Sequence, residues 1–146
     1  MLLKECCILV KDKIDSSKLN KLNYISTENL NPNFNGFTEA SSLPNGKVTK
    51  FQNGDILISN IRPYFKKGLF CNFDGGCSND VFCIRNNSLL YLNHYLYYAI
   101  SSDNFINKLV SSCKGTKMPR GDKNVLLNYN LPDIDITEQQ HIVNTK

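Results

Sequence analysis

Hydrophobic and polar positions are spaced like those of β-strands in the first half of the chain and like those of helices in the second half. Residues 6–10 are a continuous apolar run of a length typical of a buried strand, and residues 21–26 are a second candidate strand. Residues 31–46 hold two prolines, two glycines and four asparagines. This composition predicts one long surface loop after the first two strands.

A run of closely spaced short strands is predicted between residues 47 and 86. Asn53-Gly54 separates two β-rich runs and is typical of a tight hairpin turn, in which both central residues take positive φ. Asp74-Gly75-Gly76 separates two later runs in the same way. The apolar runs that predict strands here are residues 56–58, 68–73 and 79–86. Such short connections predict an antiparallel or mixed sheet.

Helical spacing replaces the strand pattern after residue 91. Residues 92–101 and 103–113 predict two short helices, with Asp103 as N-cap of the second and Gly115 just beyond its end. Residues 125–131 predict one more strand. Thr137 and Gln140 have capping-box spacing, which predicts a last helix from Glu138 that either docks on the domain or begins a longer helix.

The size and composition fit one folded domain of the α+β class. The predicted architecture is a short-stranded, mostly antiparallel or mixed β-sheet with two short helices and a C-terminal helix. A length of 146 residues is enough for a single core, and 41% hydrophobic residues exclude wholesale disorder.

The N-terminal apolar run and the cysteines bear on the compartment. No stretch approaches the roughly 18 consecutive apolar residues of a membrane helix, and charges flank the run at residues 6–10 on both sides. We therefore expect a cytoplasmic protein with no membrane partner. The six cysteines are expected to be free thiols, because a chain of this size needs no disulfides to hold its core.

Positive charge is concentrated in the middle of the chain. Residues 47–123 carry eleven basic and five acidic residues, a net charge of +6, whereas residues 1–46 are neutral and residues 124–146 carry −2. Such a distribution is expected of a surface that binds a polyanion. A solvated basic surface without a ligand is the alternative.

Candidate catalytic and metal chemistry is sparse. Cys71, Cys77 and Cys83 are spaced too widely for the close ligand pairs of a zinc site. His94, expected to be half-buried on a helix, and His141, expected on the surface, accompany no nucleophile motif. We therefore predict no catalytic residues, no metal and no cofactor.

Two segments resemble a known family. They are NGDILISNIRPYFKKGLFCNFDGGCSNDVFCIR at residues 53–85 and GTKMPRGDKNVLLNYNLPDIDITEQQHIV at residues 115–143. In this order, GDILIS, SNDVF, GTKMP after two short helices and the closing P-x-x-x-x-TEQQ-x-I resemble a target-recognition domain of the specificity subunit of type I restriction-modification systems. The resemblance extends from about Tyr24 to the end of the chain.

This resemblance implies a non-catalytic protein that binds double-stranded DNA at one half of a split target. A methyltransferase subunit would flip and methylate the adenine, and a restriction or motor subunit, reached through the complex, would cut. Residues 1–136 would be a single target-recognition domain. Residues 137–146 would be the start of a spacer helix and a candidate surface for self-association.

The chain departs from the family pattern, in which two such domains are separated by long helices. A half-size subunit, a truncated product and an excised domain all fit this departure. Two other functions stay open beside the resemblance. One is a recognition domain of a fused restriction enzyme-methyltransferase, and the other is a protein-interaction module whose basic loops bind an acidic partner. A thiol enzyme is the least favoured reading.

Basic side chains interleaved with aromatic and small polar ones are the candidate DNA contacts. Lysines suit phosphates, Arg62 and Arg120 suit bidentate contacts to guanine, and Asn79 suits adenine. The full set is Arg62, Tyr64, Lys66, Lys67, Ser78, Asn79, Lys114, Lys117, Arg120 and Lys123.

Overall fold

Strand β5 (Ile56–Ser59) lies in the middle of the fold, and all four of its residues are buried. It pairs antiparallel with β6 (Gly68–Phe70) on one side and β8 (Val81–Asn86) on the other. Strand β1 (Cys7–Leu9) completes a sheet of order β1-β8-β5-β6. The structure, a computed structural model, describes residues 1–113 and 120–145.

A second sheet has the strand order β2-β4-β7-β3. Its members are β2 (Lys13–Asp15), β4 (Lys47–Phe51), β7 (Gly75–Cys77) and β3 (Tyr24–Ile25). Strands β3 and β7 run parallel, and the other neighbours in this sheet are antiparallel. The predicted α+β class with a mostly antiparallel, mixed arrangement is therefore confirmed, although the strands divide into two sheets.

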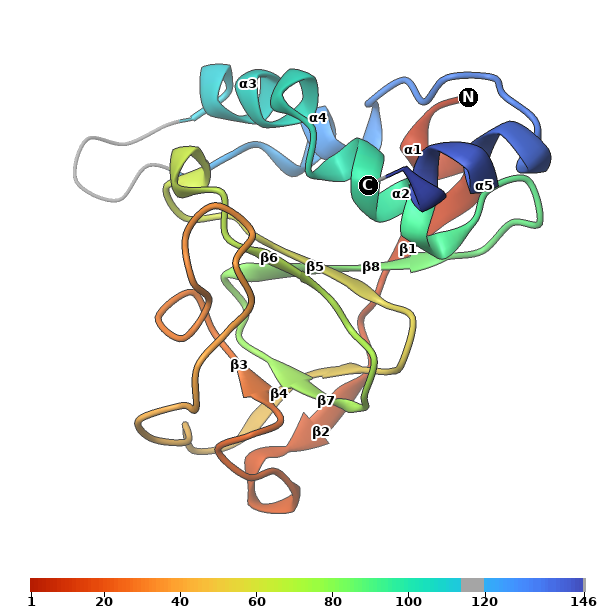
Figure 1. The fold of residues 1–146 in the computed structure, drawn as a ribbon. Helices are drawn as coiled ribbons and strands as arrows, with labels where there is room; N and C mark the ends of the chain where they lie inside the picture. The colour runs from red at the N-terminus through yellow and green to blue at the C-terminus, as the bar shows by residue number, and fades with distance from the viewer. Residues whose placement is uncertain (114–119, 146) are drawn as a thin grey trace.

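The helices form a layer over the first sheet (Figure 1). Ile56 and Ile58 of β5 pack into the core beneath the helices, while Leu57 between them packs into the core shared with the second sheet. This alternation follows from the two-residue period of a strand. In the described part of the chain the helices are α1 (Leu3–Cys6), α2 (Asn93–Ile100), α3 (Asp103–Ser111), α4 (Lys123–Leu127) and α5 (Ile136–Asn144), with short 3-10 turns η1 (Ser16–Lys18) and η2 (Pro63–Phe65).

The predicted hairpin at Asn53-Gly54 is wrong. The turn is present, with Asp55 N–H donating to the carbonyl of Gln52 at 3.0 Å, but it carries the chain from β4 in one sheet to β5 in the other. Gly54 has φ 95°, whereas Asn53 is absent from the positive-φ residues of the described chain. The turn therefore needs one glycine. Strand β4 pairs with β2 and β7, and strand β5 pairs with β6 and β8, so the two strands do not pair with each other.

Gly75 and Gly76 lie in strand β7, where the sequence predicts a turn. A Cβ on Gly75 would overlap the backbone carbonyl of Asn23, and one on Gly76 would lie 2.7 Å from the Leu19 side chain. The glycines therefore allow the neighbouring chain to approach closely, which is one of the recognised uses of glycine inside a strand.

Residues 125–131 do not form the predicted strand. Helix α4 occupies Lys123–Leu127 and begins at Asp122, whose side chain accepts the backbone N–H of Asn124 at 2.9 Å. A short apolar run does not distinguish a buried strand from a buried helical turn. The N-cap aspartate and the fully buried Leu126 are consistent with the helix.

Two other helices begin one or two residues before the predicted positions. Ser102 is the N-cap of α3, with its hydroxyl accepting from the N–H of Phe105 at 3.2 Å, and Asp103 follows in the first turn. Asp135 is the N-cap of α5 and accepts from Glu138 at 2.8 Å, in place of the predicted Thr137. Gly115 lies outside the described residues.

Helix α5 docks on the domain through Gln139, which is fully buried. Its Oε1 accepts the backbone N–H of Leu92 at 2.8 Å, and its Nε2 donates to the carbonyls of Leu90 and Ile134. The glutamine thus satisfies an amide at the start of α2. None of the helices within the described ranges is long and apolar enough to cross a membrane.

Candidate nucleic-acid interface

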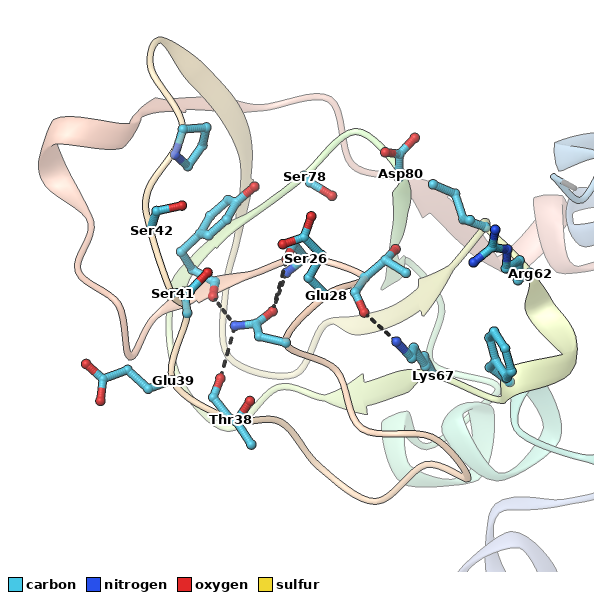
Figure 2. A pocket seen from close by; sticks show the side chains of 17 residues that line it. Ser26, Glu28, Thr38, Glu39, Ser41, Ser42, Arg62, Lys67, Ser78 and Asp80 are labelled. Carbon is cyan, nitrogen blue, oxygen red and sulfur yellow. Dashed lines mark hydrogen bonds between the residues drawn. The ribbon is translucent and has the colours of Figure 1, made fainter. Parts of the chain in front are cut away.

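A groove of about 670 Å³ lies between the long loop after β3 and the segments that follow β5 and β7. Figure 2 shows Arg62 and Lys67 at one end of it, with Ser78 and Asp80 on the side contributed by the turn before β8. Three predicted DNA-binding residues, Arg62, Lys67 and Ser78, therefore line one groove. The sequence predicts no groove, because its walls come from segments far apart along the chain.

The loop wall of the groove is held by the buried amide of Asn29. Its Oδ1 accepts the N–H of Ser26 at 2.6 Å, while its Nδ2 donates to the carbonyls of Tyr24 at 2.8 Å and Thr38 at 3.1 Å (Figure 2). One side chain thus links Tyr24 of strand β3 to Ser26 and to Thr38, which lies in the middle of the predicted surface loop. Asn29 was missed by the sequence analysis, where it is one of many asparagines.

Lys67 joins the segment that follows β5 to the loop that forms the other wall of the groove. Its Nζ donates to the carbonyl oxygen of Thr27 at 2.8 Å, across the groove (Figure 2). The hydroxyl of Thr27 is in turn 2.7 Å from the hydroxyl of Ser59, at the end of β5. Lys67 therefore presents its charge in a fixed position beside Arg62.

Arg120 reaches the same region from a distant part of the sequence. It forms an isolated antiparallel bridge with Ile61, and its Nη1 lies 2.6 Å from Oδ1 of Asp80. Gly121 follows, and its N–H donates to the carbonyl of Asn60 at 3.1 Å. A Cβ on Gly121 would lie 2.5 Å from the Leu109 side chain, so glycine lets this segment approach α3.

The remaining described candidates lie outside the groove lining. Lys66 forms an ion pair with Asp103 at 3.1 Å, on the helical side of η2. Asn79 is exposed in the turn before β8, Lys123 is exposed in the first turn of α4, and Tyr64 is exposed on η2. Lys114 and Lys117 lie outside the described residues.

Acidic side chains also line the groove and were not predicted. Glu28, Glu39 and Asp80 face it together with Arg62 and Lys67 (Figure 2). Burial raises the pKa of Tyr24, which also lines the groove, so this hydroxyl adds no charge to it. The groove thus has mixed charge, and its cationic groups gather at the end formed by residues 61–67.

The described side chains offer little for metal or thiol chemistry. Within residues 1–113 and 120–145, no three His, Cys, Asp or Glu side chains lie together in a metal-binding arrangement. All six cysteines are free thiols, as predicted. Burial raises the pKa of Cys7, Cys71 and Cys113, whereas a reactive thiol needs a lowered one.

The two histidines lie on different elements. His94 is exposed, so the predicted half-buried position is wrong, but its ring stacks on Phe70 with centroids 4.1 Å apart. His141 is exposed on α5, as predicted.

Comparison with known proteins finds specificity subunits of type I restriction systems, both by sequence and by structure. The specificity subunit of the type I restriction enzyme EcoDI from Escherichia coli is 30% identical over 94 residues, which are 64% of this chain and 20% of that protein. The chain therefore spans about a fifth of the length of this curated relative. No model of a known protein family matches the chain.

Solved structures share the fold over 99% of this chain. The HsdS subunit from Thermoanaerobacter tengcongensis has a TM-score of 0.75 at 24% identity, over 40% of its own length. The type I restriction-modification S subunit from M. genitalium has a TM-score of 0.68 at 16% identity, over 37% of its length. The resemblance to type I specificity subunits predicted from the sequence is thus confirmed, and the fold is that of part of such a subunit.

Proposed function

We propose that this chain is a DNA target-recognition domain that binds one half of a split double-stranded sequence. The observation that carries the proposal is that Arg62 and Lys67 line one end of the groove and that Arg120, from a distant part of the sequence, pairs with Asp80 of the same lining. Fixed cations beside a rigid sheet suit the recognition of a duplex, because phosphate contacts set the register in which side chains meet base edges.

Phosphate and base contacts are assigned by side-chain chemistry. Lys66, Lys67 and Lys123 would neutralise phosphates, as would Lys114 and Lys117. Arg62 and Arg120 carry the fork of N–H groups that fits O6 and N7 of guanine, and the amide of Asn79 fits adenine. Tyr64 and Ser78 would add further contacts to the DNA.

The partners follow from the specificity subunits that the chain resembles. We propose that it directs a methyltransferase subunit to the target, and through the complex a restriction subunit, while contributing no catalytic group itself. This work would take place in the cytoplasm. Residues 1–136 would form the recognition domain, and residues 137–146 would begin a spacer helix that offers a surface for self-association.

Duplex selection from a random pool tests the proposal. The purified chain, with and without the methyltransferase subunit, is incubated with random duplexes across a salt series, and the bound fraction is sequenced. We expect enrichment of one short motif and an affinity that falls steeply with salt, because binding releases counterions from the phosphates. The alternative of a fused restriction enzyme-methyltransferase is tested by the flanking sequence, because a methyltransferase domain continuous with this chain would favour it.

Charge-matched variants localise the contact. Lys67→Ala should weaken duplex binding and reduce the slope of log affinity against log salt by about one. Lys4→Ala removes the same charge from α1, at the other end of the helical layer, and should leave both unchanged (Figure 1). No enrichment and no salt-dependent binding, with the partner present, would contradict the proposal and favour a protein-interaction module.

A further inference from the structure

Tyr64 and Phe65 form an exposed aromatic pair on the turn η2. Their side chains are 47% and 43% exposed, and their ring centroids lie 4.9 Å apart at an interplanar angle of 59°. Aromatic rings of this size normally contribute to a core. Two neighbouring rings on a surface turn therefore point to a ligand that covers them.

The backbone of this turn is held in place from several directions. Within it, Phe65 N–H donates to the carbonyl of Arg62, and Lys66 N–H donates to that of Pro63, both at 3.0 Å. The long loop adds two bonds, from Asn33 N–H to the carbonyl of Phe65 at 3.0 Å and from Phe34 N–H to that of Lys66 at 2.7 Å. The aromatic pair is thus carried on a preorganised support.

Both residues that flank the turn have left-handed backbone conformations. Arg62 has φ 46° and Lys66 has φ 56°, values that side-chain-bearing residues rarely adopt. Such conformations persist where the surrounding contacts impose them, and they recur at ligand-binding segments. Glycine at position 62 or 66 would relieve the backbone strain. The chain instead has basic residues at both positions, on either side of the aromatic pair.

Cationic side chains frame the aromatic pair. Arg62, Lys66 and Lys67 all lie within three residues of it, and Lys67 Nζ is 6.0 Å from the centroid of the Phe65 ring. This combination of flat apolar rings and surrounding positive charge complements stacked bases between two phosphate backbones. A second exposed apolar position, Leu89, is 97% exposed, but residues 86–100 contain no Lys or Arg.

We infer that Tyr64 and Phe65 form an aromatic wedge that unstacks one base-pair step of the bound duplex. The inference rests on the DNA-binding function proposed above. Tyr64, the more exposed ring, would enter between adjacent base pairs, and Phe65, which lines the groove with Lys67, would support it from behind. Proteins that insert such wedges kink the duplex and choose sequences whose steps deform easily.

Site-specific 2-aminopurine fluorescence tests the wedge on the selected duplex. The base analogue replaces adenines one at a time along the motif and its flanks, and it brightens when its neighbours unstack. We expect the wild-type chain to raise the fluorescence at one step and at none of the others. Tyr64→Ala should abolish the rise and weaken binding about tenfold, as expected when one base–aromatic stack is lost.

Two further variants separate a wedge from a general surface contact. Tyr64→Leu keeps an apolar side chain and should retain most of the rise, whereas Leu89→Ala should leave both fluorescence and affinity unchanged. An abasic site placed at the same step should restore the affinity of Tyr64→Ala, because the cost of unstacking has been removed in advance.

The outcomes distinguish this inference from the proposed function. Binding of the wild-type chain to the motif without a rise at any step would overturn the wedge and leave DNA recognition standing. Retention of the rise in Tyr64→Ala would also overturn the wedge. Absence of duplex binding by the wild-type chain would overturn both.

Discussion

Arg120 donates a 2.6 Å hydrogen bond from Nη1 to Oδ1 of Asp80. The two side chains are 52% and 37% exposed, so the pair is open to solvent and adds little to folding stability. A guanidinium carries five N–H donors. The Asp80 carboxylate orients the Arg120 side chain through Nη1, and among the described residues no hydrogen bond from the other guanidinium nitrogens competes with the proposed base contact.

Substitution of Asp80 by Asn should therefore reduce sequence discrimination and tighten non-specific binding. The amide removes a negative charge from the lining of the proposed DNA-binding groove, so affinity for an unrelated duplex should rise. The loss of a charged anchor should reduce affinity for the motif, so that the specificity ratio falls up to about tenfold, within the range expected for one bidentate base contact. Parallel titrations of the motif and a scrambled duplex measure this ratio.

Arg120→Ala separates a base contact from a phosphate contact. If Arg120 reads a base, its loss should cost about 1–3 kcal/mol on the motif and relax the preference at one position. An equal loss on every duplex would identify a phosphate contact. Asp80→Glu retains the charge and should preserve more of the discrimination than Asp80→Asn does.

Asp55 and Arg85 form a contrasting pair inside the fold. The Asp55 side chain is almost fully buried and accepts N–H groups from Arg85 Nε at 2.9 Å and Nη2 at 2.8 Å. Arg85→Met should cost about 3–5 kcal/mol of unfolding free energy, because it leaves a buried carboxylate without its cation. Urea unfolding measures the loss. Arg120→Ala, at an exposed pair, should change stability by less than about 1 kcal/mol.

The sequence predicts local elements of this fold but neither of the two ion pairs, Arg120–Asp80 and Arg85–Asp55. Residues 56–58 are identified as a buried strand because this short run follows Asn53-Gly54 and contains two β-branched isoleucines, and the helices at 93–100 and 103–111 have clear periodicity. Neither ion pair is predictable, because each joins segments whose adjacency arises only in the folded chain. The same is true of Asn29, whose role depends on where strand β3 lies.

The errors have local physical causes. Asn53-Gly54 fits a hairpin in isolation, yet β4 and β5 satisfy their hydrogen bonds in different sheets. Tertiary pairing thus overrides a strong turn signal. At the candidate interface, Arg62, Lys67 and Arg120 were proposed from their residue type. The acidic groove lining of Glu28, Glu39 and Asp80 was missed, because charge counts along a chain do not reveal which opposite charges lie close together in the fold.

Adjacent glutamines on α5 should differ sharply in their effect on stability. Gln139 is buried and satisfies three backbone groups, whereas Gln140 is exposed and bonds to Asn144 on the same helix at 2.9 Å. Gln139→Ala should cost about 3 kcal/mol, since each buried polar group left without a partner costs about 1–3 kcal/mol.

Gln140→Ala is the matched control and should change the unfolding free energy by less than about 0.5 kcal/mol. Equal effects of the two substitutions would contradict the proposed anchoring of α5 by Gln139. Chemical denaturation of both variants, followed by circular dichroism, supplies the comparison.

Buried thiols should react slowly until the chain unfolds. Burial raises the pKa of Cys7 and Cys71, so at pH 8 these groups are protonated and lack the nucleophilic thiolate. Reaction with a thiol reagent should accelerate strongly in denaturant, when six cysteines become accessible. A rapidly alkylated cysteine in the native protein would instead favour the thiol-enzyme reading.

Lys66 permits a direct measurement of the backbone strain in η2. Its φ of 56° lies in the left-handed region, which costs a side-chain-bearing residue roughly 1–2 kcal/mol relative to glycine. Lys66→Ala and Lys66→Gly both remove the ion pair with Asp103, so they differ only in backbone preference. We expect the glycine variant to be about 1 kcal/mol more stable than the alanine variant by urea unfolding. Equal stabilities would mean that Lys66 leaves the left-handed region at little cost, and that the support of the aromatic pair is less constrained than its hydrogen bonds indicate.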